Sequence, residues 1–350
     1  MSKPTLLLLV ILLAMITGGV ALARVASVKT PTEYDILRRI PKDRLRSLIG
    51  ESRPDEQGFV GTNHRAGKWI EAGTQRGSCR VVIYGVVTDD LAAADDGWRG
   101  IEATFAHQRE DGGFEANDRP NGASAKPFGA AVETSYFFLQ ELGRTILIIR
   151  QSPHEAHFKA RIAKLEPKIR LAMSFVLSGY DTIITKSTHS VNRIVIAAKA
   201  FGLCGIVLKD QRLIDTSRKL VAHALTRRDQ DGVFLEKGGR DSSYNVVSIL
   251  FGQVLALHLP IPDFEAALPK AVAWQLTKIR DNGEVDVTGN TRTGVGAEKS
   301  YFGEPKEVNY GEVVQALTLY GLVRGEKATV AAADRVFAFW QARNSVPKQE

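Results

Sequence analysis

The sequence predicts an all-α protein whose helical hairpins close into an (α/α) toroid or incomplete barrel. The first supporting observation is helical periodicity, because apolar residues recur every three or four positions along much of the chain. One such run consists of Phe158, Ile162, Leu165, Ile169, Met173 and Val176. The second is a turn sequence that recurs between helices, and the third is the scarcity of strand patterns. A solenoid of helix pairs is the structural alternative.

An Asp-Gly turn recurs between the predicted helices. Residues 111–114 read Asp-Gly-Gly-Phe, residues 231–234 read Asp-Gly-Val-Phe, and residues 281–285 read Asp-Asn-Gly-Glu-Val. Residues 179–181, Gly-Tyr-Asp, are interpreted as a degenerate fourth copy. Aspartate bonds the local backbone and glycine accepts a positive φ, so each copy predicts a turn. The last three copies are spaced by about 50 residues, the size of one helical hairpin, and about six hairpins fit into residues 65–350.

The N-terminal residues predict export. Lys3 precedes an apolar run from Leu6 to Ile16, and residues 21–23 form an A-x-A ending. This order is typical of a secretory signal peptide over residues 1–23, cleaved after Ala23. An uncleaved membrane anchor is the alternative, because residues 5–23 are just long enough to span a bilayer. The expected location is periplasmic or secreted, or anchored in the inner membrane facing the periplasm.

The exported part divides into an N-terminal extension, residues 24–64, and the toroid domain, residues 65–350. One helix is predicted from Pro31 to Ile49, because proline suits a first helical turn and Gly50 suits a helix end. Pro167 interrupts a periodic run and predicts a kink or a new helix. Residues 80–84 are the best strand candidate and fit a buried helix equally well. Beyond the N-terminal run, no segment is expected to span a membrane.

Composition limits the partners and cofactors. The chain has 350 residues, 44% hydrophobic and 24% charged, which is ordinary globular composition. Its net charge of +7 favours an anionic partner, and export makes an acidic polysaccharide more plausible than nucleic acid. Two cysteines exclude a disulfide scaffold and a four-cysteine zinc site. The histidine spacing indicates no metal site, so neither a metal nor another cofactor is expected.

Two polar segments each open an apolar helix. In the first, His189, Asn192 and Arg193 stand at i, i+3 and i+4, so they share one face of the predicted helix. In the second, Arg240 and Tyr244 are four residues apart. The segments lie two helices apart, and in a toroid such helices are neighbours in the same ring. We therefore expect both clusters to face one central cleft.

These residue types suit β-elimination from a uronic acid. The substrate carboxylate must be neutralised, and His189, Asn192 and Arg240 are suitable donors. A base must take the C5 proton and an acid must protonate the leaving oxygen, and Tyr244 or His189 can serve in these roles. A neighbouring arginine is expected to lower the tyrosine pKa toward working pH. The predicted catalytic residues are thus these four.

Residues 188–257 resemble the (α/α)-toroid polysaccharide lyases of the alginate lyase type. Those enzymes carry Asn-His at the start of one inner helix, and Arg followed shortly by Tyr on the next. By this resemblance His189 matches the family histidine, Arg240 the arginine and Tyr244 the tyrosine. Here a threonine precedes the histidine, the nearest asparagine is Asn192 one turn later, and the Arg-to-Tyr spacing is shorter. The resemblance implies a lyase that needs no metal.

A third segment, residues 289–310, is rich in aromatic, Asn, Arg and Lys residues, which commonly bind sugars. It is a long non-periodic stretch, and long loops are often functional. The predicted substrate-binding residues, from this segment and the two polar clusters, are Arg193, Asn245, Arg292, Tyr301 and Tyr310.

The predicted function is that of an exported lyase acting on an acidic, uronate-containing polysaccharide. A glycoside hydrolase on the same fold is the first alternative. That reaction needs two carboxylates across the scissile bond, and Glu133, Asp241 and Asp286 are the candidates. A non-catalytic polysaccharide-binding protein of the cell envelope is the second alternative.

Overall fold

Helices account for nearly all regular structure in the part of the chain that the computed structural model describes. The described residues are 31–49, 53–120, 122, 127–187, 189–296, 298–300 and 302–345. Among them, strand pairing is limited to isolated bridges within turns. The predicted signal peptide lies outside the described residues, so it stays a prediction.

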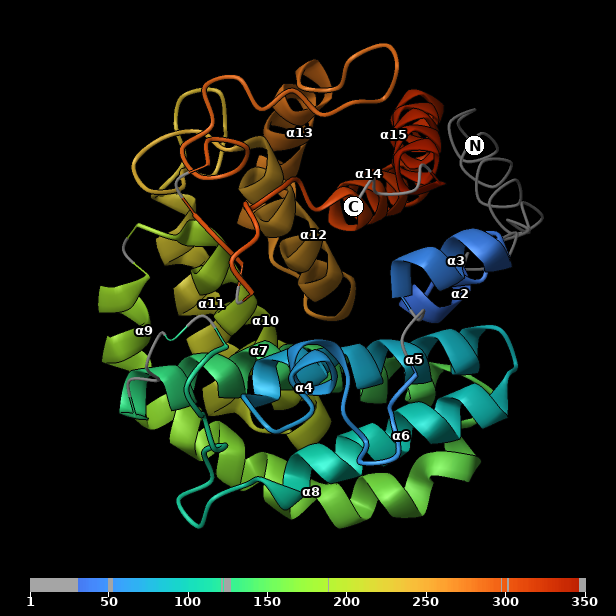
Figure 1. Cartoon of the computed structure of the whole chain (residues 1–350), viewed down its shortest axis with the longest axis vertical. Coiled ribbons are helices and arrows are strands. Elements are labelled where there is room, and N and C mark those ends of the chain that lie inside the picture. Colours follow the sequence, from blue (N-terminus) through green and yellow to red (C-terminus); the bar gives the residue numbers. More distant parts are fainter. Residues whose placement is uncertain are drawn as a thin grey trace, which may run out of the picture. The chain divides into compact units, whose positions relative to one another are not determined.

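Within the described residues, five helical hairpins form a ring of inner helices covered by outer helices (Figure 1). The inner helices are α5 (Arg76–Val87), α7 (Pro127–Gln151), α10 (Val191–Leu208), α12 (Ser242–His258) and α14 (Tyr310–Arg324). The outer helices are α6 (Leu91–Ala106), α8 (Glu155–Ser178), α11 (Gln211–Leu225), α13 (Pro262–Thr277) and α15 (Lys327–Ser345). Each inner helix packs against its outer partner, and successive inner helices pack against one another. This confirms the (α/α) toroid in its incomplete form, with five hairpins where about six were expected.

The inner helices are buried on almost every side. In the described part of the chain, α10 alone has the length and hydropathy of a membrane span, and it lies in the protein core. Small residues allow close approach of helices, since a Cβ on Gly252 of α12 would overlap the ring of Phe264. Residues 80–84 form part of α5, so the buried-helix interpretation is correct. Pro167 does not start a new helix, because α8 continues through it.

Two short helices at the start of the described chain close the ring. Residues 31–49 form α2 (Glu33–Leu37) and α3 (Lys42–Ile49) rather than one helix, with Pro41 between them. The α3 helix packs against α5 and α14, which are the first and last inner helices. The α2 helix packs against α7, α12 and α14. Residues 32–64 therefore belong to the same compact unit as the toroid.

The predicted Asp-Gly turns have one common geometry. In each, a glycine at positive φ donates its N–H to the carbonyl three residues earlier: Gly112 to Arg109, Gly232 to Asp229 and Gly283 to Arg280. Residues 298–306 contain a further turn with the same bonds, centred on Ser300 and Gly303, that has no Asp-Gly sequence. The degenerate copy at 179–181 is not such a turn, because it joins α8 directly to α9 (Tyr180–Lys186).

A network of buried charges links α2 to the inner helices. Arg144 of α7 donates to Glu33 of α2 at 2.8 Å and to Glu141 at 2.8 Å. Lys199 of α10 donates to Glu141 at 2.8 Å, and His258 of α12 lies 2.7 Å from Glu33. The carboxylates and the ammonium group are fully buried, so this network depends on complete pairing for its stability.

Candidate active site

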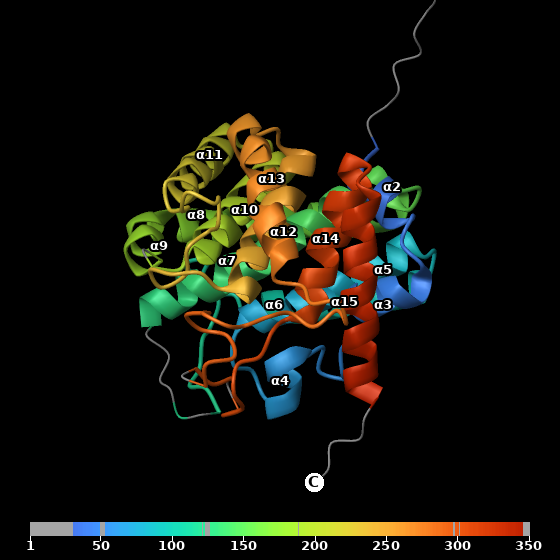
Figure 2. The same ribbon diagram turned by 90° about the horizontal axis from the view of Figure 1, so that it is seen from above.

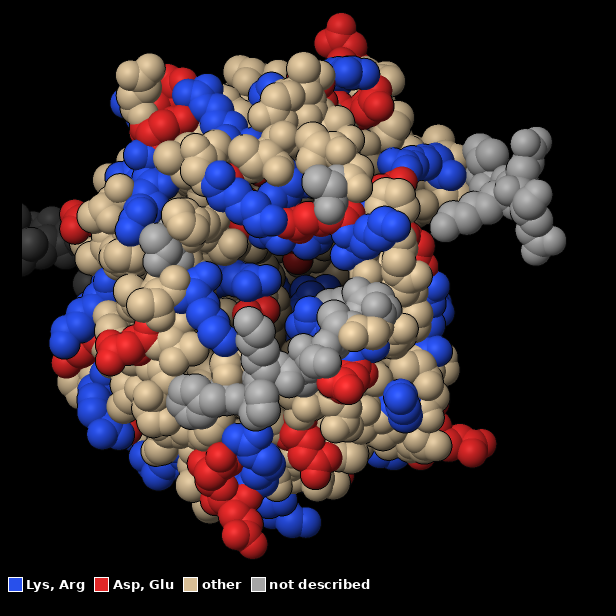
Figure 3. Space-filling model, turned by 60° about the vertical axis from the view of Figure 1, so that its left-hand side comes forward, with Lys and Arg blue, Asp and Glu red and all other residues tan. Residues whose placement is uncertain are grey.

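A cavity of about 790 Å³ lies at the N-terminal ends of the inner helices. Arg76 begins α5, Asn192 and Arg193 lie in the first turn of α10, Tyr244 in that of α12 and Glu312 in that of α14. Figure 3 shows a hollowed face where Lys and Arg side chains gather together with carboxylates. Free N–H groups and the macrodipole make a helix N-terminus favourable for an anion. Several such termini converge here, so the cavity is suited to an anionic ligand.

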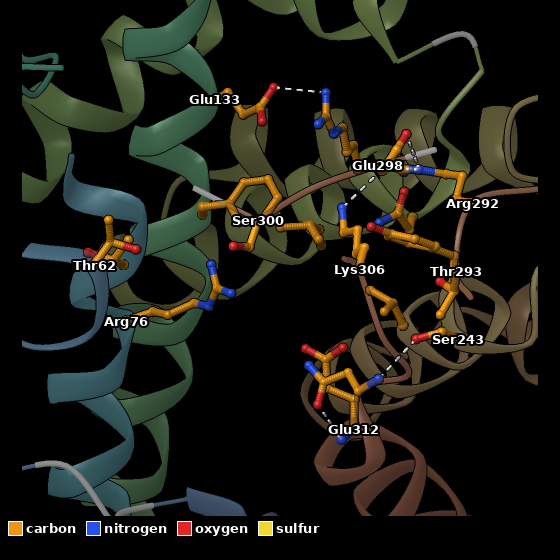
Figure 4. A pocket seen from close by; sticks show the side chains of 18 of the residues that line it. Thr62, Arg76, Glu133, Ser243, Arg292, Thr293, Glu298, Ser300, Lys306 and Glu312 are labelled. Atoms are coloured by element: carbon orange, nitrogen blue, oxygen red, sulfur yellow. Dashed lines mark hydrogen bonds and ion pairs between the residues drawn. The ribbon is translucent and has the colours of Figure 1, made fainter. Parts of the chain in front are cut away.

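Asn192 and Arg193 form one wall of the cavity. Arg193 pairs with Glu133 of α7, with Nη1 and Oε2 3.1 Å apart (Figure 4). The side chain of Asn192 is 5% exposed, and its buried Oδ1 has no hydrogen-bond partner among the described residues. An unsatisfied buried amide is costly unless a ligand or water bonds to it. Asn192 is therefore placed to bind a polar ligand in the cavity.

Tyr244 lies on the neighbouring wall, flanked by two cations. The guanidinium of Arg292 lies 4.0 Å from the centroid of the tyrosine ring, and the ammonium of Lys306 lies 5.0 Å from it. Burial raises the pKa of Tyr244, and the opposing effect of Arg292 is smaller. The expectation of a lowered tyrosine pKa is therefore wrong, because desolvation outweighs the nearby positive charge. Tyr244 is a proton donor rather than a phenolate in the free protein.

Arg292 is occupied by carboxylates. Its Nε and Nη2 donate to Glu298 at 3.0 and 2.8 Å, and Nη1 donates to the buried Glu236. Although burial opposes the shift, hydrogen bonds from Arg292 and Lys237 lower the pKa of Glu298 to about 2. Burial lowers the pKa of Lys306, with a further contribution from the charge of Arg292. Arg292 thus lines the cavity mainly as a support for the groups around Tyr244.

Glu312 is a buried carboxyl group that the sequence did not single out. It is 8% exposed, lines the cavity, and forms no side-chain hydrogen bond or ion pair among the described residues. Burial raises its pKa, and the positive charges of Arg80 and Arg76 oppose the shift only in part. Such a carboxyl holds its proton to higher pH and can donate it to a ligand. Acidic residues are common in the first turn of a helix, where they interact favourably with the helix dipole. The sequence therefore does not distinguish Glu312 from an ordinary residue of this kind.

Several predicted site residues lie outside the cavity. His189 is exposed in the turn before α10, and Arg240 pairs with Asp229 and Asp231 of the preceding Asp-Gly turn. Asn245 is fully buried, where it accepts a hydrogen bond from the Phe234 N–H.

Some of the remaining predicted binding residues line the cavity and others do not. Tyr310 is buried against Phe339 and does not line the cavity, whereas Arg193 and Arg292 do. Tyr301 lies outside the described residues. The structure thus brings together Asn192, Arg193, Tyr244 and Arg292.

The predicted carboxylate candidates have structural roles for the most part. Asp241 is buried and accepts backbone N–H groups of Ser243 and Arg292, so it caps α12. Asp286 lies in a turn, where hydrogen bonds from Thr288 lower its pKa to about 2. Glu133 does line the cavity, but as the ion-pair partner of Arg193. Among the described residues, no group of His, Cys, Asp and Glu side chains is arranged to hold a metal ion.

Comparison with known proteins identifies the fold. No family model matches the chain, and no curated protein matches its sequence. A solved structure described as a UGL variant with dGlcA-Glc-Rha-Glc is 14% identical, with a TM-score of 0.50 over 77% of this chain and 78% of that chain. The shared fold of the two is the (α/α) toroid.

Two further solved structures are similar at lower scores. One is the chondroitin AC lyase of Streptomyces coelicolor A3 in complex with chondroitin sulphate, at 14% identity and a TM-score of 0.49 over 88% of this chain and 48% of that chain. The other is an unsaturated glucuronyl hydrolase from Bacillus sp. GL1, responsible for the degradation of glycosaminoglycan. It is 14% identical, with a TM-score of 0.47 over 77% of this chain and 78% of that chain. This chain thus spans about half the length of the chondroitin AC lyase.

Proposed function

We propose that this chain is a carbohydrate-active enzyme that binds a uronate-containing saccharide in the cavity and cleaves it by β-elimination. The observation that carries the proposal is the meeting of Asn192, Arg193 and Tyr244 in one cavity at the N-termini of the inner helices. Donors and helix N-termini favour the charge that develops when the proton next to a carboxylate is removed. In this proposal Asn192 and Arg193, which line the cavity, take the role expected of His189 and Asn192.

In this mechanism Tyr244 is the acid. Because burial keeps its hydroxyl protonated, Tyr244 donates a proton to the leaving glycosidic oxygen. The C5 proton needs a separate base, and Lys306 lies beside the tyrosine ring. Burial lowers the pKa of Lys306, and its ion pair with Glu298 at 3.3 Å opposes this shift, so the amine becomes a base when the substrate displaces that pair. The Nδ2 group of Asn192 donates to the substrate carboxylate while its unpartnered Oδ1 accepts from a sugar hydroxyl, and the guanidinium of Arg193, shared with Glu133, donates beside it. The electron pair released at C5 forms the double bond as the C4–O bond breaks.

Product absorbance tests the reaction class. We expect the purified protein to release an unsaturated uronate from at least one of alginate, polygalacturonate and chondroitin sulphate, seen as rising ultraviolet absorbance. Reducing ends without absorbance would indicate hydrolysis instead. Binding without either product would leave a non-catalytic polysaccharide-binding protein.

A glycoside hydrolase is the second candidate, and Glu312 favours it. A buried carboxyl with a raised pKa is the usual general acid of such enzymes. Its partner carboxylate would be Glu133, which lines the same cavity and pairs directly with Arg193. Under this mechanism Glu312→Gln abolishes the release of reducing ends, while Tyr244→Phe retains it.

We also propose that the chain is exported, to the periplasm or beyond it. The support is the sequence of residues 1–23, which has a basic start, an apolar run and an A-x-A ending. N-terminal sequencing of protein from the cell envelope tests this, with Arg24 expected as the first residue. An intact Met1 in the membrane fraction would indicate an anchor.

A further inference from the structure

A contact between distant parts of the chain joins two segments that line the cavity. Arg65 lies in α4 (Gly61–Ala66), and its Nη2 donates to Oε1 of Glu304 at 2.5 Å. The same guanidinium lies 3.7 Å from the ring centroid of Phe302. Glu304 and Phe302 belong to the turn of residues 298–306, and Figure 2 shows this turn beside α4 at one end of the ring. We call this contact the Arg65–Glu304 bridge.

The two segments that the bridge joins line the cavity from opposite sides. Thr62 of α4 stands on one wall and Arg292 on the other, and Ser300 of the turn lies between them (Figure 4). The described residues of the turn therefore lie between the wall that carries Arg292 and α4, and the bridge joins them to α4.

The inner end of the cavity is closed by the buried charge network. Gln140 lines the cavity and accepts a hydrogen bond from Lys199 at 2.6 Å. The ammonium of Lys199 also lies 4.8 Å from the ring of Phe251, another lining residue. Glu141 and Arg144 lie immediately beyond and are buried. Within the described residues, the cavity has no passage through the ring in this direction.

We propose that the Arg65–Glu304 bridge restricts this enzyme to the ends of acidic polysaccharide chains and to short oligosaccharides. A cavity that is closed at its inner end, and whose opposite walls are joined by the bridge, admits the end of a chain, whereas the interior of a polymer needs a groove open at both ends. The proposal rests on the proposed function, because it assumes that the saccharide binds beside Tyr244 and Asn192. It makes Arg65 a specificity-determining residue outside the proton-transfer groups.

The binding stoichiometry on long polymer tests this without requiring turnover. Calorimetry is performed on wild type with alginate, polygalacturonate and chondroitin sulphate of defined chain length. We expect saturation at one protein per chain end, independent of chain length. Arg65→Ala opens the entrance, so its stoichiometry should rise to several proteins per chain and increase with length. The variant should fold normally, because Arg65 and Glu304 are 57% and 47% exposed and such pairs contribute little stability.

A matched variant and a charge exchange serve as controls. Arg53→Ala removes an arginine of similar exposure, 58%, that pairs with Asp96 outside the cavity, and it should bind as wild type does. Exchange of the charges in Arg65→Glu with Glu304→Arg should return the stoichiometry toward one protein per chain end.

Cleavage gives a second readout. Wild type should lower the viscosity of a polymer slowly for each bond broken, because end release shortens chains little, and Arg65→Ala should lower it faster. The proposal is overturned if wild type already binds many sites per chain, or if Arg65→Ala leaves stoichiometry and viscosity unchanged. If the protein cleaves no polymer but still binds only at chain ends, the proposed function is rejected. The proposal that the bridge restricts binding to chain ends would then still hold.

Discussion

At the scale of single residues, Tyr244 is the group whose surroundings are most specialised. Two cations flank its ring, and its hydroxyl forms no hydrogen bond within the described residues. The helix that carries it is fixed by Asp241, which bonds to the N–H of Tyr244 at 3.1 Å and also to the neighbouring Arg292 and Thr293 N–H groups. The hydroxyl is therefore held in place by its ring and backbone and is left available to a ligand.

Tyr244→Phe tests this role directly. We expect cleavage to slow by about 100-fold or more, the usual loss for a removed proton-transfer group. The thermal unfolding temperature should change little, because no protein hydrogen bond is lost. Rate and unfolding temperature are measured on the same sample. A fully active variant would exclude Tyr244 as the acid.

Glu312→Gln tests the buried carboxyl through the pH dependence of stability. Below its ordinary pKa of 4.5, Glu312 is protonated in both the folded and the unfolded chain and has no pH-dependent effect. As the pH rises, the unfolded chain loses this proton first, so wild type loses stability until the raised folded pKa is passed. Glutamine does not ionise.

The variant should therefore unfold at a higher temperature than wild type at pH 7, and this advantage should disappear near pH 4. Thermal unfolding of both proteins across this range measures the difference. An advantage that is equal at both pH values would indicate that the carboxyl has no raised pKa.

The sequence predicts a site residue correctly where it predicts the first residue of the helix correctly. Asn192, Arg193 and Tyr244 were found because they open apolar helices. His189 was assigned to the same helix face, but α10 begins at Val191, so the histidine lies in a turn outside that face. A shift of helix start by a few residues is the least predictable feature of a sequence.

At the scale of structural elements, the repeated turn is the connection that ends the outer helices α6, α11 and α13. Its glycine must adopt a positive φ while the chain passes closely over the next hairpin. At Gly283 φ is +89°, and an added Cβ would lie 2.1 Å from the carbonyl oxygen of Arg335. Gly289 has a similar φ of +79° and no neighbouring atom within 4 Å of such a Cβ.

These two glycines separate backbone strain from steric overlap. Gly289→Ala should cost about 1 kcal/mol in unfolding free energy, the strain of a left-handed residue. Gly283→Ala carries the same strain and forces the turn away from α15, which should add about 1–3 kcal/mol. Chemical denaturation measures both values. Equal losses would mean that the turn does not press on α15.

The Asp-Gly sequence allowed three of these turns to be predicted, because both residues have a local reason to be there. The sequence does not predict the turn at 298–306, because Phe302 stands where the other turns have Asp or Asn before the glycine, although Gly303 also has a positive φ of +91°. The break between α2 and α3 differs from the single helix that Pro31 and Gly50 predict, because Pro41 interrupts the helix between them. Local sequence therefore predicts a turn only where turn-forming residues such as Asp and Gly occupy it.

At the scale of the whole molecule, the buried network joins α2, α7, α10 and α12 through Glu33, Arg144, Glu141, Lys199 and His258. Its components were visible in the sequence as isolated charges within apolar helices, such as Lys199 in α10. Their pairing was not predictable, because partners such as Glu33 and His258 are 225 positions apart. Helical periodicity indicates which faces are buried and does not indicate which helices meet.

Arg144→Met tests how strongly the network stabilises the ring. The change leaves Glu33 and Glu141 buried without their shared cation, which should cost about 3–5 kcal/mol of unfolding free energy. Arg150→Met on the same helix removes a partly exposed pair with Glu166 and should cost at most about 1 kcal/mol. Urea denaturation compares the two. Similar small losses would show that the remaining partners, His258 and Lys199, neutralise the carboxylates alone.

The closing of the ring by its first helices has a consequence for biosynthesis. Arg44 of α3 donates to Thr318 of α14 at 2.7 Å, across 274 positions of sequence, and also pairs with Asp334 of α15. The residues of α3 thus find these partners only after α14 and α15 have been synthesised. Contacts this distant in sequence slow folding, because a long loop must be ordered before they form. The ring therefore cannot close before α14 and α15 have been synthesised, and a nascent chain that stops before α14 exposes the surface of α3 that these two helices cover.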